Sequence, residues 1–480
     1  MGKKKHIMIQ GTGSGVGKSI LVAGLCRLLT NKGYKVAPFK AQNMALNSGV
    51  TFDGLEMGRA QILQAEACKM LPDVRMNPIL LKPTGKGMSQ IIRLGKPYKT
   101  VSYRDYYKLY NENLQVVKEA FESLERENDF LVIEGAGSPA EINLQKYDIV
   151  NMKMAEIADA KVYIVGDIDR GGIFASFKGT YDLIEEKYKN YIKGFVINKF
   201  RGDSSLLEPA FGLFKSYCPI PIKGVIPYFE HCLEDEDSQG LKNSVDKKSA
   251  EIKIGVIKLK YLSNFTDFLP LQILDNVMLK YTDDPDDLDS FDAIIIPGSK
   301  NSILDMKFLK KKGLFEKIKS LYGKKLIMGI CGGFQMLGDE IIDEDGVEDA
   351  GNMDGFGFVH MKTLFDREKI LRRKEYIASG DYFTGKISGY EIHHGRSIIH
   401  DDRVENLLIE NGLLIYDREN RVIGTYLHGI FENADFIKFF FKLLNKNVEI
   451  SKTYFELKEE SLEKLASMLE ENLWKNIKND

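Results

Sequence analysis

The sequence predicts an α/β fold made of two doubly wound domains. Short apolar, β-rich runs alternate with helical patterns along most of the 480 residues, and this alternation favours parallel sheets covered by helices on both faces. One hydrophobic core rarely serves more than about 300 residues, so a chain of this length is expected to divide. Each half also carries one glycine-rich turn between a strand and a helix.

The first series of runs predicts a parallel sheet in a domain that spans residues 1–232. Its strands are expected at 6–10, 35–41, 130–134, 161–167, 194–199 and 222–227. Residues 233–250 are polar and charged without an apolar period, which is typical of a linker.

The second series predicts another parallel sheet in a domain that spans residues 251–437. Its strands are expected at 253–259, 277–281, 293–297, 326–331 and 422–427. Residues 438–480 form a helical extension, in which leucines between 457 and 473 recur at helical spacing. We expect this terminal helix to pack on the second domain.

Composition narrows the class of protein. The net charge of −2 gives no general attraction to nucleic acid or to an acidic membrane. No continuous apolar stretch is long enough to span a bilayer. The five cysteines are scattered without metal-site spacing, as expected of reduced thiols in the cytoplasm. We expect a cytoplasmic protein with small-molecule partners and leave its oligomeric state open.

Residues 11–19, Gly-Thr-Gly-Ser-Gly-Val-Gly-Lys-Ser, are typical of a phosphate-binding loop. The strict P-loop pattern Gly-x-x-x-x-Gly-Lys-Ser requires glycine at position 12, where this chain has Thr12. The nearest preceding glycine, Gly11, lies one residue too early. Phosphate binding does not depend on that glycine, because the backbone amides at a helix N-terminus bind phosphate. We expect Gly13, Gly15 and Gly17 to contribute those amides, Lys18 to supply a charge, and the Ser19 hydroxyl to ligate Mg²⁺.

An ATP–Mg²⁺ site also needs a carboxylate, and Glu134 ends the apolar strand 130–134 where one is expected. Lys40 is a candidate second phosphate contact, and Asn198 either reads a base edge or caps a strand end. Other charged residues cluster at or after strand ends, where open α/β sheets bind ligands. They form a candidate acceptor or metal site: Asp148, Asp167, Asp169 and Arg170.

Cys331 lies in the run Gly-Ile-Cys-Gly-Gly-Phe-Gln-Met-Leu-Gly at 329–338, directly after a buried-strand pattern. Glycines on both sides permit the sharp strand-to-helix turn of a nucleophile elbow, and the N-terminus of the following helix favours a thiolate. Of the seven histidines, His428 is the best candidate base, because it ends an apolar strand and precedes a glycine.

The surroundings of this thiol can also be predicted. The amides of Gly298 and Gly332 are candidates for an oxyanion hole, and Gln335 and His393 are candidate contacts to the substrate. Glu391, His394 and Arg396 are expected to flank the same pocket with His393.

These motifs resemble known families. The run around Cys331, with Gly-Thr-Tyr-Leu-His-Gly at 424–429, resembles class I glutamine amidotransferase domains, which implies a flavodoxin-like second domain. The N-terminal half resembles dethiobiotin-synthetase-like ATPase domains, a P-loop NTPase-like fold whose loop has the same extra residue. In this order, from about residue 6 to about 435, the two are similar to the cobyric acid synthase family of cobalamin biosynthesis. GAGSPAEINL at 135–144 and GDIDRGG at 166–172 discriminate best.

The resemblance implies a glutamine-hydrolysing amide ligase that uses ATP and Mg²⁺. Cys331 would form a thioester with glutamine and release ammonia, with His428 moving the protons. A carboxylate of adenosylcobyrinic acid a,c-diamide, at the b, d, e and g positions in turn, would be phosphorylated by ATP and aminolysed. Many class I enzymes have Glu two residues after the histidine, where this chain has Ile430. The resembled family lacks that acid too, so what orients His428 stays open.

Three alternatives fit parts of the sequence. The sister enzyme that amidates the a and c positions of cobyrinic acid has the same domain plan, but the runs at 135–144 and 40–43 favour the later enzyme. A MinD/ParA-like ATPase fused to a sensor domain leaves Cys331 and His428 unexplained. A thiol hydrolase with a degenerate ATPase conflicts with the intact Lys18, Ser19 and Glu134.

Overall fold

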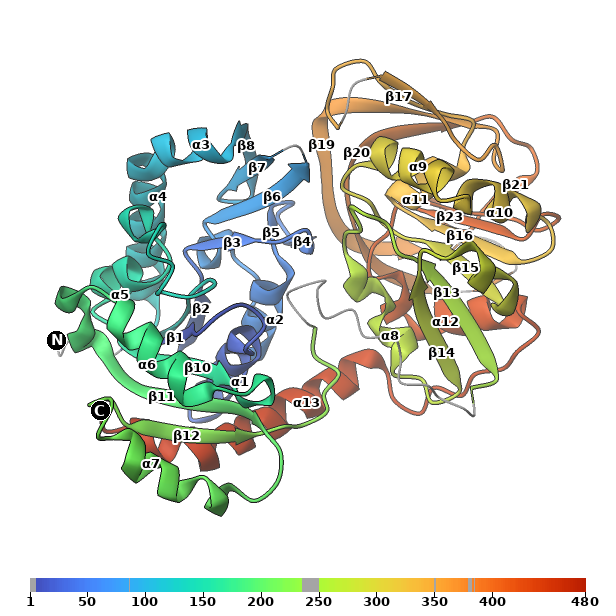
Figure 1. Cartoon of the computed structure of the whole chain (residues 1–480). Coiled ribbons are helices and arrows are strands. Elements are labelled where there is room, and N and C mark those ends of the chain that lie inside the picture. The colour runs from blue at the N-terminus through green and yellow to red at the C-terminus, as the bar shows by residue number, and fades with distance from the viewer. Residues whose placement is uncertain (1–5, 86, 235–249, 349–350, 379–381, 384) are drawn as a thin grey trace. The chain divides into compact units, whose positions relative to one another are not determined.

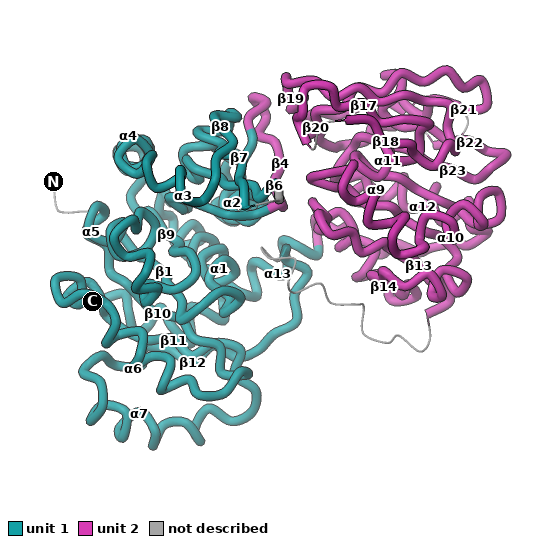
Figure 2. Tube along the Cα trace, turned by 45° about the horizontal axis from the view of Figure 1, so that its top comes forward, with its two compact units in different colours: residues 1–45, 56–237, 457–480 teal, residues 46–55, 238–456 magenta. Residues whose placement is uncertain are grey.

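The computed structural model describes residues 6–85, 87–234, 250–348, 351–378, 382–383 and 385–480 (Figure 1). Most of the predicted linker 233–250 therefore lies outside the described residues. The chain forms two compact units, coloured separately in Figure 2. Unit 1 comprises residues 1–45, 56–237 and 457–480, and unit 2 comprises residues 46–55 and 238–456.

Unit 1 is built on a six-stranded parallel sheet with the strand order β12-β11-β10-β1-β9-β2. Each of the six strands predicted in the first series is present. Their bounds are β1 (Ile7–Gly11), β2 (Val36–Phe39), β9 (Phe130–Glu134), β10 (Lys161–Asp167), β11 (Ile192–Phe200) and β12 (Ile222–Pro227).

Both faces of this sheet are buried. Successive side chains of a strand point to opposite faces, so each strand contributes to a core on either side. On β1, Met8 joins one core and Ile7 and Ile9 join the other. Helices cover each face: α1 (Lys18–Asn31), α2 (Arg59–Ala67), α4 (Tyr110–Glu127), α5 (Met152–Ala158), α6 (Ile173–Leu183) and α7 (Glu208–Phe214). None of the helices in the described ranges combines the length and apolarity needed to cross a membrane. The predicted doubly wound arrangement is confirmed for this half.

A smaller sheet, which the sequence did not predict, stands beside the main one. Its order is β3-β6-β7-β8, with β3 parallel to β6 and the other pairs antiparallel. The strands are β3 (Gln42–Met44), β6 (Ile79–Gly85), β7 (Met88–Arg93) and β8 (Lys96–Ser102), and β8 leads into α3 (Tyr103–Tyr106). The short β5 (Glu56–Gly58) precedes α2.

The C-terminal helix α13 (Tyr454–Leu469) packs on α1 in unit 1, so the expectation that it packs on the second domain was wrong. A Cβ placed on Gly24 of α1 would lie 2.6 Å from Leu465 Cγ, which shows how closely the two helices approach. The buried guanidinium of Arg27 binds Glu459 at 2.7 Å and Glu463 at 2.9 Å. Helical spacing predicts an apolar stripe but carries no information about its partner.

Unit 2 contains a seven-stranded sheet in the order β14-β13-β15-β16-β23-β22-β21. The first five strands are parallel and correspond to the second predicted series, whereas β22 and β21 are antiparallel. The strands are β13 (Ile252–Ile257), β14 (Val277–Thr282), β15 (Ala293–Ile296), β16 (Leu326–Ile330), β21 (Val404–Asn406), β22 (Leu414–Asp417) and β23 (Val422–Thr425). The helices are α8 (Leu269–Gln272), α9 (Ser302–Lys311), α10 (Leu314–Ser320), α11 (Gly332–Leu337) and α12 (Ala434–Leu443).

A second sheet of unit 2 has the order β18-β17-β19-β20. Its strands are β17 (Glu340–Asp343), β18 (Gly351–Asp354), β19 (Met361–Ile377) and β20 (Lys386–Ile399). The segment 46–55 also belongs to unit 2, although the sequence placed it within the first domain. In its strand β4 (Ser48–Val50), Val50 packs against Tyr390 and Ile392 of β20.

Replacing Leu465 by alanine is expected to destabilise unit 1 by about 2–5 kcal/mol, because the fully buried side chain fills the space between α13 and α1. Urea denaturation of Leu465→Ala against the wild type measures this loss. Lys464→Ala, on the exposed face of the same helix, is the matched control and should change little. Equal stabilities for Leu465→Ala and Lys464→Ala would contradict the packing of α13 on α1.

Candidate active sites

The glycine-rich loop after β1 wraps around the side chain of Lys18, the first residue of α1. Gly15 and Gly17 have φ values of 70° and 98°, in the left-handed region that favours glycine. Lys18 Nζ donates to Gly13 O at 2.9 Å and to Gly137 O at 3.2 Å. The predicted loop residues thus lie together at the N-terminus of a 14-residue helix, which is a favourable place for phosphate.

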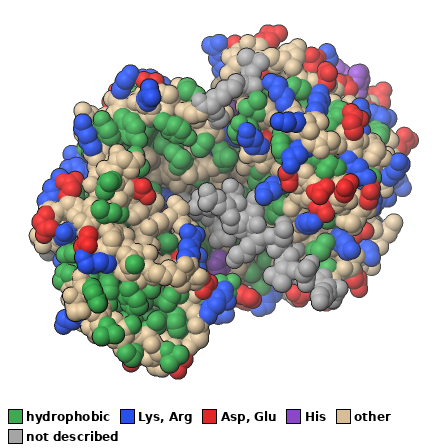
Figure 3. Space-filling model, viewed as in Figure 1, with side chains coloured by type: hydrophobic (Ala, Val, Ile, Leu, Met, Phe, Trp, Pro, Cys, Tyr) green, Lys and Arg blue, Asp and Glu red, His purple; other side chains and the backbone are tan. Residues whose placement is uncertain are grey.

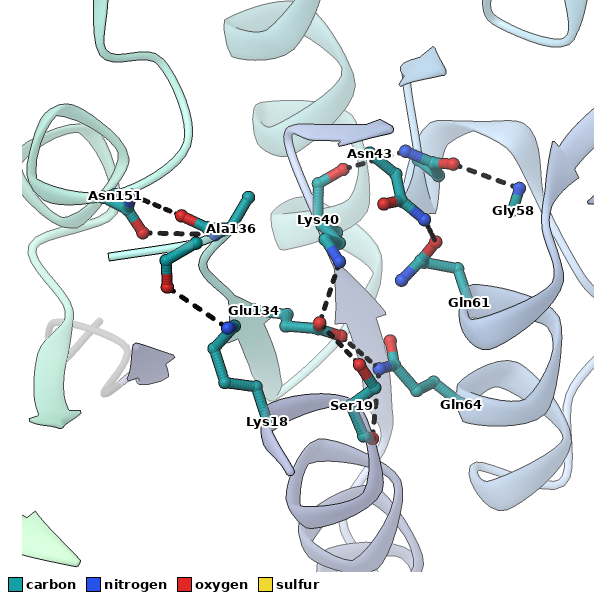
Figure 4. Close-up of polar contacts among 12 residues, drawn as sticks. Lys18, Ser19, Lys40, Asn43, Gly58, Gln61, Gln64, Glu134, Ala136 and Asn151 are labelled. Carbon is teal, nitrogen blue, oxygen red and sulfur yellow. Dashed lines mark hydrogen bonds and ion pairs between the residues drawn. The ribbon is translucent and has the colours of Figure 1, made fainter. Parts of the chain in front are cut away.

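Glu134, at the end of β9, is the centre of a buried polar cluster shown in Figure 4. Its carboxylate accepts hydrogen bonds from Ser19 Oγ at 2.8 Å, Lys40 Nζ at 2.9 Å and Gln64 Nε2 at 2.5 Å. A buried carboxylate is costly unless it is paired and hydrogen-bonded, and these three donors meet that need. Ser19, Lys40 and Glu134, which the sequence predicted separately, therefore meet in one place.

Gln64 was missed by the sequence analysis, although it lies within the helix that follows Gly58. It is on the same face of α2 as Gln61, whose Oε1 accepts from Asn43 Nδ2 at 2.9 Å. Two glutamines three residues apart on one buried helix face, Gln61 and Gln64, were the sequence signal that could have indicated this polar cluster.

The oxygen atoms around Glu134 suit a hard divalent cation. The Ser19 hydroxyl and the Glu134 carboxylate are the oxygen ligands that Mg²⁺ takes in nucleotide sites. Gln64, which donates to Glu134 through Nε2, has a buried Oε1 that accepts no hydrogen bond from the described residues. Unsatisfied buried oxygens in a polar cluster indicate room for a cation or its water ligands. The donor set therefore fits the Mg²⁺ that the sequence led us to expect.

Asn198 and Lys199 of β11 brace the phosphate-binding loop from its other side. Asn198 Nδ2 donates to Val16 O at 2.8 Å, and Lys199 Nζ donates to Gly15 O at 2.8 Å. Gly17 has no room for a side chain, since a Cβ there would lie 2.3 Å from Asn198 Nδ2. In this structure the side chain of Asn198 therefore holds the loop by a hydrogen bond to the loop's backbone.

The four candidate acceptor residues divide into two places. Asp167 pairs with Lys199 Nζ at 2.8 Å and with Arg170 Nε at 3.5 Å, while Asp169 pairs with Arg201 at 3.4 Å. These three lie beside the phosphate-binding loop. The Asp148 carboxylate instead accepts the amides of residues 150, 151 and 153 at 2.9, 2.8 and 3.0 Å.

Cys331 lies in the predicted strand-to-helix elbow between β16 and α11. Its φ of 51° is in the left-handed region, which is uncommon for a residue with a side chain and marks backbone strain at functional sites. Gly333 allows the turn, because a Cβ there would lie 1.9 Å from Ile296 O. Cys331 Sγ donates to Ile392 O at 3.9 Å.

His428 joins Cys331 to a carboxylate that the sequence analysis did not identify. Its ring lies near enough to Cys331 for the two side chains to interact electrostatically, and its Nδ1 lies 2.6 Å from Asp267 Oδ2. Asp267 is held in turn by the amide of Gly429, which donates to Oδ1 at 2.9 Å. Nucleophile, base and orienting acid form the triad arrangement of covalent catalysis. Asp267 therefore orients His428. In many class I enzymes a Glu two residues after the histidine is present, but that position is Ile430 in this chain.

Asp267 comes from the short helical segment Phe265–Phe268 in the connection after β13. It is 161 residues from His428 along the chain, so no local spacing could identify it. The available signal was an acid between two phenylalanines after the first strand of the domain.

The triad holds a proton on the imidazole. Burial alone would lower the pKa of His428, but the charges of Asp267 and Cys331 and the hydrogen bonds to both raise it to about 10. The imidazolium form therefore persists at neutral pH beside the sulfur, where it can donate a proton to a leaving group.

The candidate oxyanion residues lie against this triad. A Cβ placed on Gly332 would lie 2.8 Å from Ser299 N, and one on Gly298 would lie 3.0 Å from His428 Cε1. A side chain at 332 would force the backbone at 299 to move, and one at 298 would crowd the imidazole. The backbones at 298–299 and 332 therefore meet beside the nucleophile, where a tetrahedral oxyanion would form.

Gln335 and His393 both lie near Tyr426. Ser302 Oγ donates to Gln335 Oε1 at 3.0 Å. Burial raises the pKa of the Tyr426 hydroxyl, and Gln335 is one of the nearby side chains that oppose this rise. The ring of His393 stacks on Tyr426 with centroids 3.9 Å apart.

The neighbours of His393 on β20 divide between two sets of contacts. Glu391 Oε2 lies 3.3 Å from His393 Nε2. His394 and Arg396, which were expected beside the pocket, instead contact Asp366, at its backbone oxygen and its carboxylate respectively.

Two family models match the chain. The CobQ/CobB/MinD/ParA nucleotide binding domain covers residues 7–241, and the CobB/CobQ-like glutamine amidotransferase domain covers residues 253–436. Fold and sites thus define a glutamine amidotransferase joined to a nucleotide-binding domain.

Curated relatives are similar over nearly their whole length. A cobyric acid synthase of Clostridium novyi is 44% identical, covering 98% of this chain and 96% of the relative. One of Clostridium kluyveri is 46% identical over 97% and 96%, and one of Carboxydothermus hydrogenoformans is 46% identical over 98% and 97%. The chain belongs to the cobyric acid synthase family, and it is a glutamine-dependent amide ligase.

Replacing Asp267 by asparagine is expected to lower glutaminase kcat by about 10²- to 10⁴-fold, because the amide neither fixes the imidazole tautomer nor stabilises its charge. Removing the anion also lowers the pKa of His428. Since the protonated imidazole is the proton donor, activity in the variant should decline at a lower pH than in the wild type, whose imidazole keeps its proton up to about pH 10.

The measurement is glutamate release as a function of pH. Asp275→Asn, an exposed acid in the connection after α8, is the matched control and should keep the wild-type profile. A variant with the wild-type rate and the wild-type alkaline limb would show that Asp267 does not orient His428.

Proposed function

We propose that this enzyme amidates the b, d, e and g carboxylates of adenosylcobyrinic acid a,c-diamide, using glutamine as nitrogen donor and ATP as energy source. The observation that carries the proposal is one chain with two chemistries: a Cys331–His428–Asp267 triad and a phosphate-binding loop facing Glu134. Amidation in cobalamin biosynthesis follows from family membership.

Ammonia is released in unit 2. Cys331 Sγ attacks the carboxamide carbon of glutamine, and the amides near 298–299 and 332 stabilise the negative oxygen. The C–N bond breaks as His428 gives its proton to the departing nitrogen, which leaves as ammonia. His428 then deprotonates a water molecule, which hydrolyses the thioester. This step releases glutamate and regenerates the free thiol.

The acceptor is activated in unit 1. A carboxylate is a poor electrophile because its charge is delocalised, so it first attacks the γ-phosphorus of ATP and becomes an acyl phosphate, releasing ADP. Lys18 and the amides of its loop hold the phosphates. Ser19 and Glu134 are the residues that would hold Mg²⁺, which would supply positive charge to offset that of the phosphate oxygens. Ammonia then displaces phosphate to form the amide.

Direct supply of ammonia from glutamine gives the two sites a reason to share one chain. Ammonia released into neutral water is mostly protonated, and the ammonium ion has no lone pair to attack the acyl phosphate. Mass spectrometry of adenosylcobyrinic acid a,c-diamide incubated with enzyme, glutamine and ATP tests the substrate. We expect four successive carboxylate-to-amide conversions, whereas an unchanged substrate would refute the assignment.

Replacing Cys331 by alanine is expected to lower glutamine-dependent amidation by about 10³-fold or more, because the nucleophile is lost. Synthesis from a high concentration of ammonium salt should continue, since unit 1 is untouched. Cys232→Ala, which removes a partly buried thiol outside the elbow, is the matched control for both assays. Equal loss of both activities in Cys331→Ala would contradict the division of roles.

Replacing Lys18 by alanine is expected to lower amidation from either nitrogen source by about 10²- to 10³-fold, because a charge that stabilises the transferring phosphoryl group is removed. Lys35→Ala, an exposed lysine before β2, is the control and should keep full activity. Wild-type ammonia-dependent turnover in Lys18→Ala would exclude this loop as the phosphate site.

A further inference from the structure

A cavity of about 300 Å³ opens in unit 1 beside the phosphate-binding loop, and the mechanism above does not use it. Its walls come from β3, the β8–α3 turn, the loop after β9 and the segment after α6. Five tyrosines line it: Tyr103, Tyr106, Tyr107, Tyr147 and Tyr188. In Figure 3, hydrophobic side chains gather over the part of unit 1 that carries α3 and the strands beside it.

The tyrosines present ring faces and edges suited to stacking. The rings of Tyr107 and Tyr147 have centroids 4.6 Å apart and are tilted by 30°, and Tyr110 packs edge-on against Tyr147 at 6.0 Å. Tyr147 and Tyr103 are 36% and 49% exposed, so these large apolar groups lie open to a ligand. Aromatic surface of this kind is found where ligands are bound, because stacking and burial both contribute to affinity.

The charge of the wall excludes a simple anion site. The lining residues that the structure describes include no lysine or arginine, and three carboxylates, Glu141, Asp148 and Glu185, belong to it. The Asp148 carboxylate is held by three backbone amides. The described lining therefore offers no positive side chain to an anion, and its aromatic surface suits an uncharged part of a ligand.

One loop separates this cavity from the phosphate-binding lysine. Residues 136–139 line the cavity, and the same loop offers Gly137 O to Lys18 Nζ at 3.2 Å. The Asn151 side chain clamps the loop, donating to Ala136 O at 2.7 Å and accepting from Ala136 N at 3.2 Å (Figure 4). A ligand seated in the cavity thus lies next to the place where phosphate is transferred.

We propose that this tyrosine-lined cavity binds the macrocyclic ring of the acceptor and presents one carboxylate arm at a time to the phosphate-binding loop. This inference rests on the proposed function, since it assigns the acceptor site of that reaction. The macrocycle packs against the aromatic pair formed by Tyr107 and Tyr147, and the anionic arm extends past residues 136–139 toward Lys18. A volume at the lower end of the roughly 300–1,000 Å³ typical of ligand pockets means that the cavity grips one edge of the ring.

The same wall gives a physical reason why one phosphate site can serve several arms. Stacking on ring faces tolerates in-plane rotation of the ligand, whereas directional hydrogen bonds fix one orientation. A pocket made mostly of aromatic faces therefore accepts the ring in each orientation that brings a different arm to Lys18.

Tyr107→Ala tests the proposal by equilibrium binding of adenosylcobyrinic acid a,c-diamide to the full chain, followed by the visible absorbance of the corrinoid. We expect Kd to rise about tenfold, since both the aromatic contact and the buried apolar area are lost. Tyr107→Phe keeps the ring and should bind nearly as the wild type. The KM for ATP and the glutaminase rate should not change in either variant. Tyr217→Ala, a 70% exposed tyrosine outside the cavity, is the matched control.

Hydrogen–deuterium exchange of the wild type gives a test that needs no variant. Added corrinoid should protect residues 101–107 and 136–148. Unchanged affinity in Tyr107→Ala, or absence of that protection, would overturn the cavity as the acceptor site while the wild type still forms amides. If the wild type forms no amide from this corrinoid, the proposed function itself fails, so the two outcomes are distinguishable.

Discussion

The chemistry of this chain depends on one constraint: strands buried on both faces are mostly apolar along their length, and ligand-binding side chains gather at their carboxyl ends. Glu134 ends β9, Lys40 follows β2, and Lys18 follows the loop after β1. In unit 2, Cys331 follows β16 and His428 follows β23. Parallel strands bring such ends to one edge of a sheet, so residues more than 90 positions apart meet within hydrogen-bond distance. Each charge placed there needs a partner, and Glu134 and His428 both have one.

The parts of the structure that rest on local sequence could be predicted. Apolar runs of strand length marked all eleven strands that the sequence analysis placed in the two main sheets. Glycine patterns marked both turns, because the positive φ of Gly17 and the packing of Gly333 against Ile296 leave no space for another residue. The places of Cys331, His428, Lys18, Ser19 and Glu134 at the ends of strands or the start of a helix could therefore be predicted.

The parts that rest on distant partners could not be predicted. Asp267 reaches His428 across 161 residues, and the leucines of α13 fit any apolar face until α1 is seen beside them. Segment 46–55 looked like a continuation of the first domain, but Val50 packs on Tyr390 of unit 2. Asp148 was grouped by charge with Asp167 and Asp169, yet its carboxylate is used by backbone amides. Sequence spacing reveals a side chain's face and chemistry, whereas its partner depends on the tertiary fold.

Nitrogen released at the triad is expected to be transferred to an acid activated in the same polypeptide. The most direct measurement supplies glutamine labelled with ¹⁵N in its amide group, together with ATP, the corrinoid acid and an excess of unlabelled ammonium. Mass spectrometry of the products then gives their isotope content. Products that carry ¹⁵N despite the surrounding ammonium are expected. Products with the isotope composition of the bulk ammonium would show that the two sites act independently, and would contradict the account.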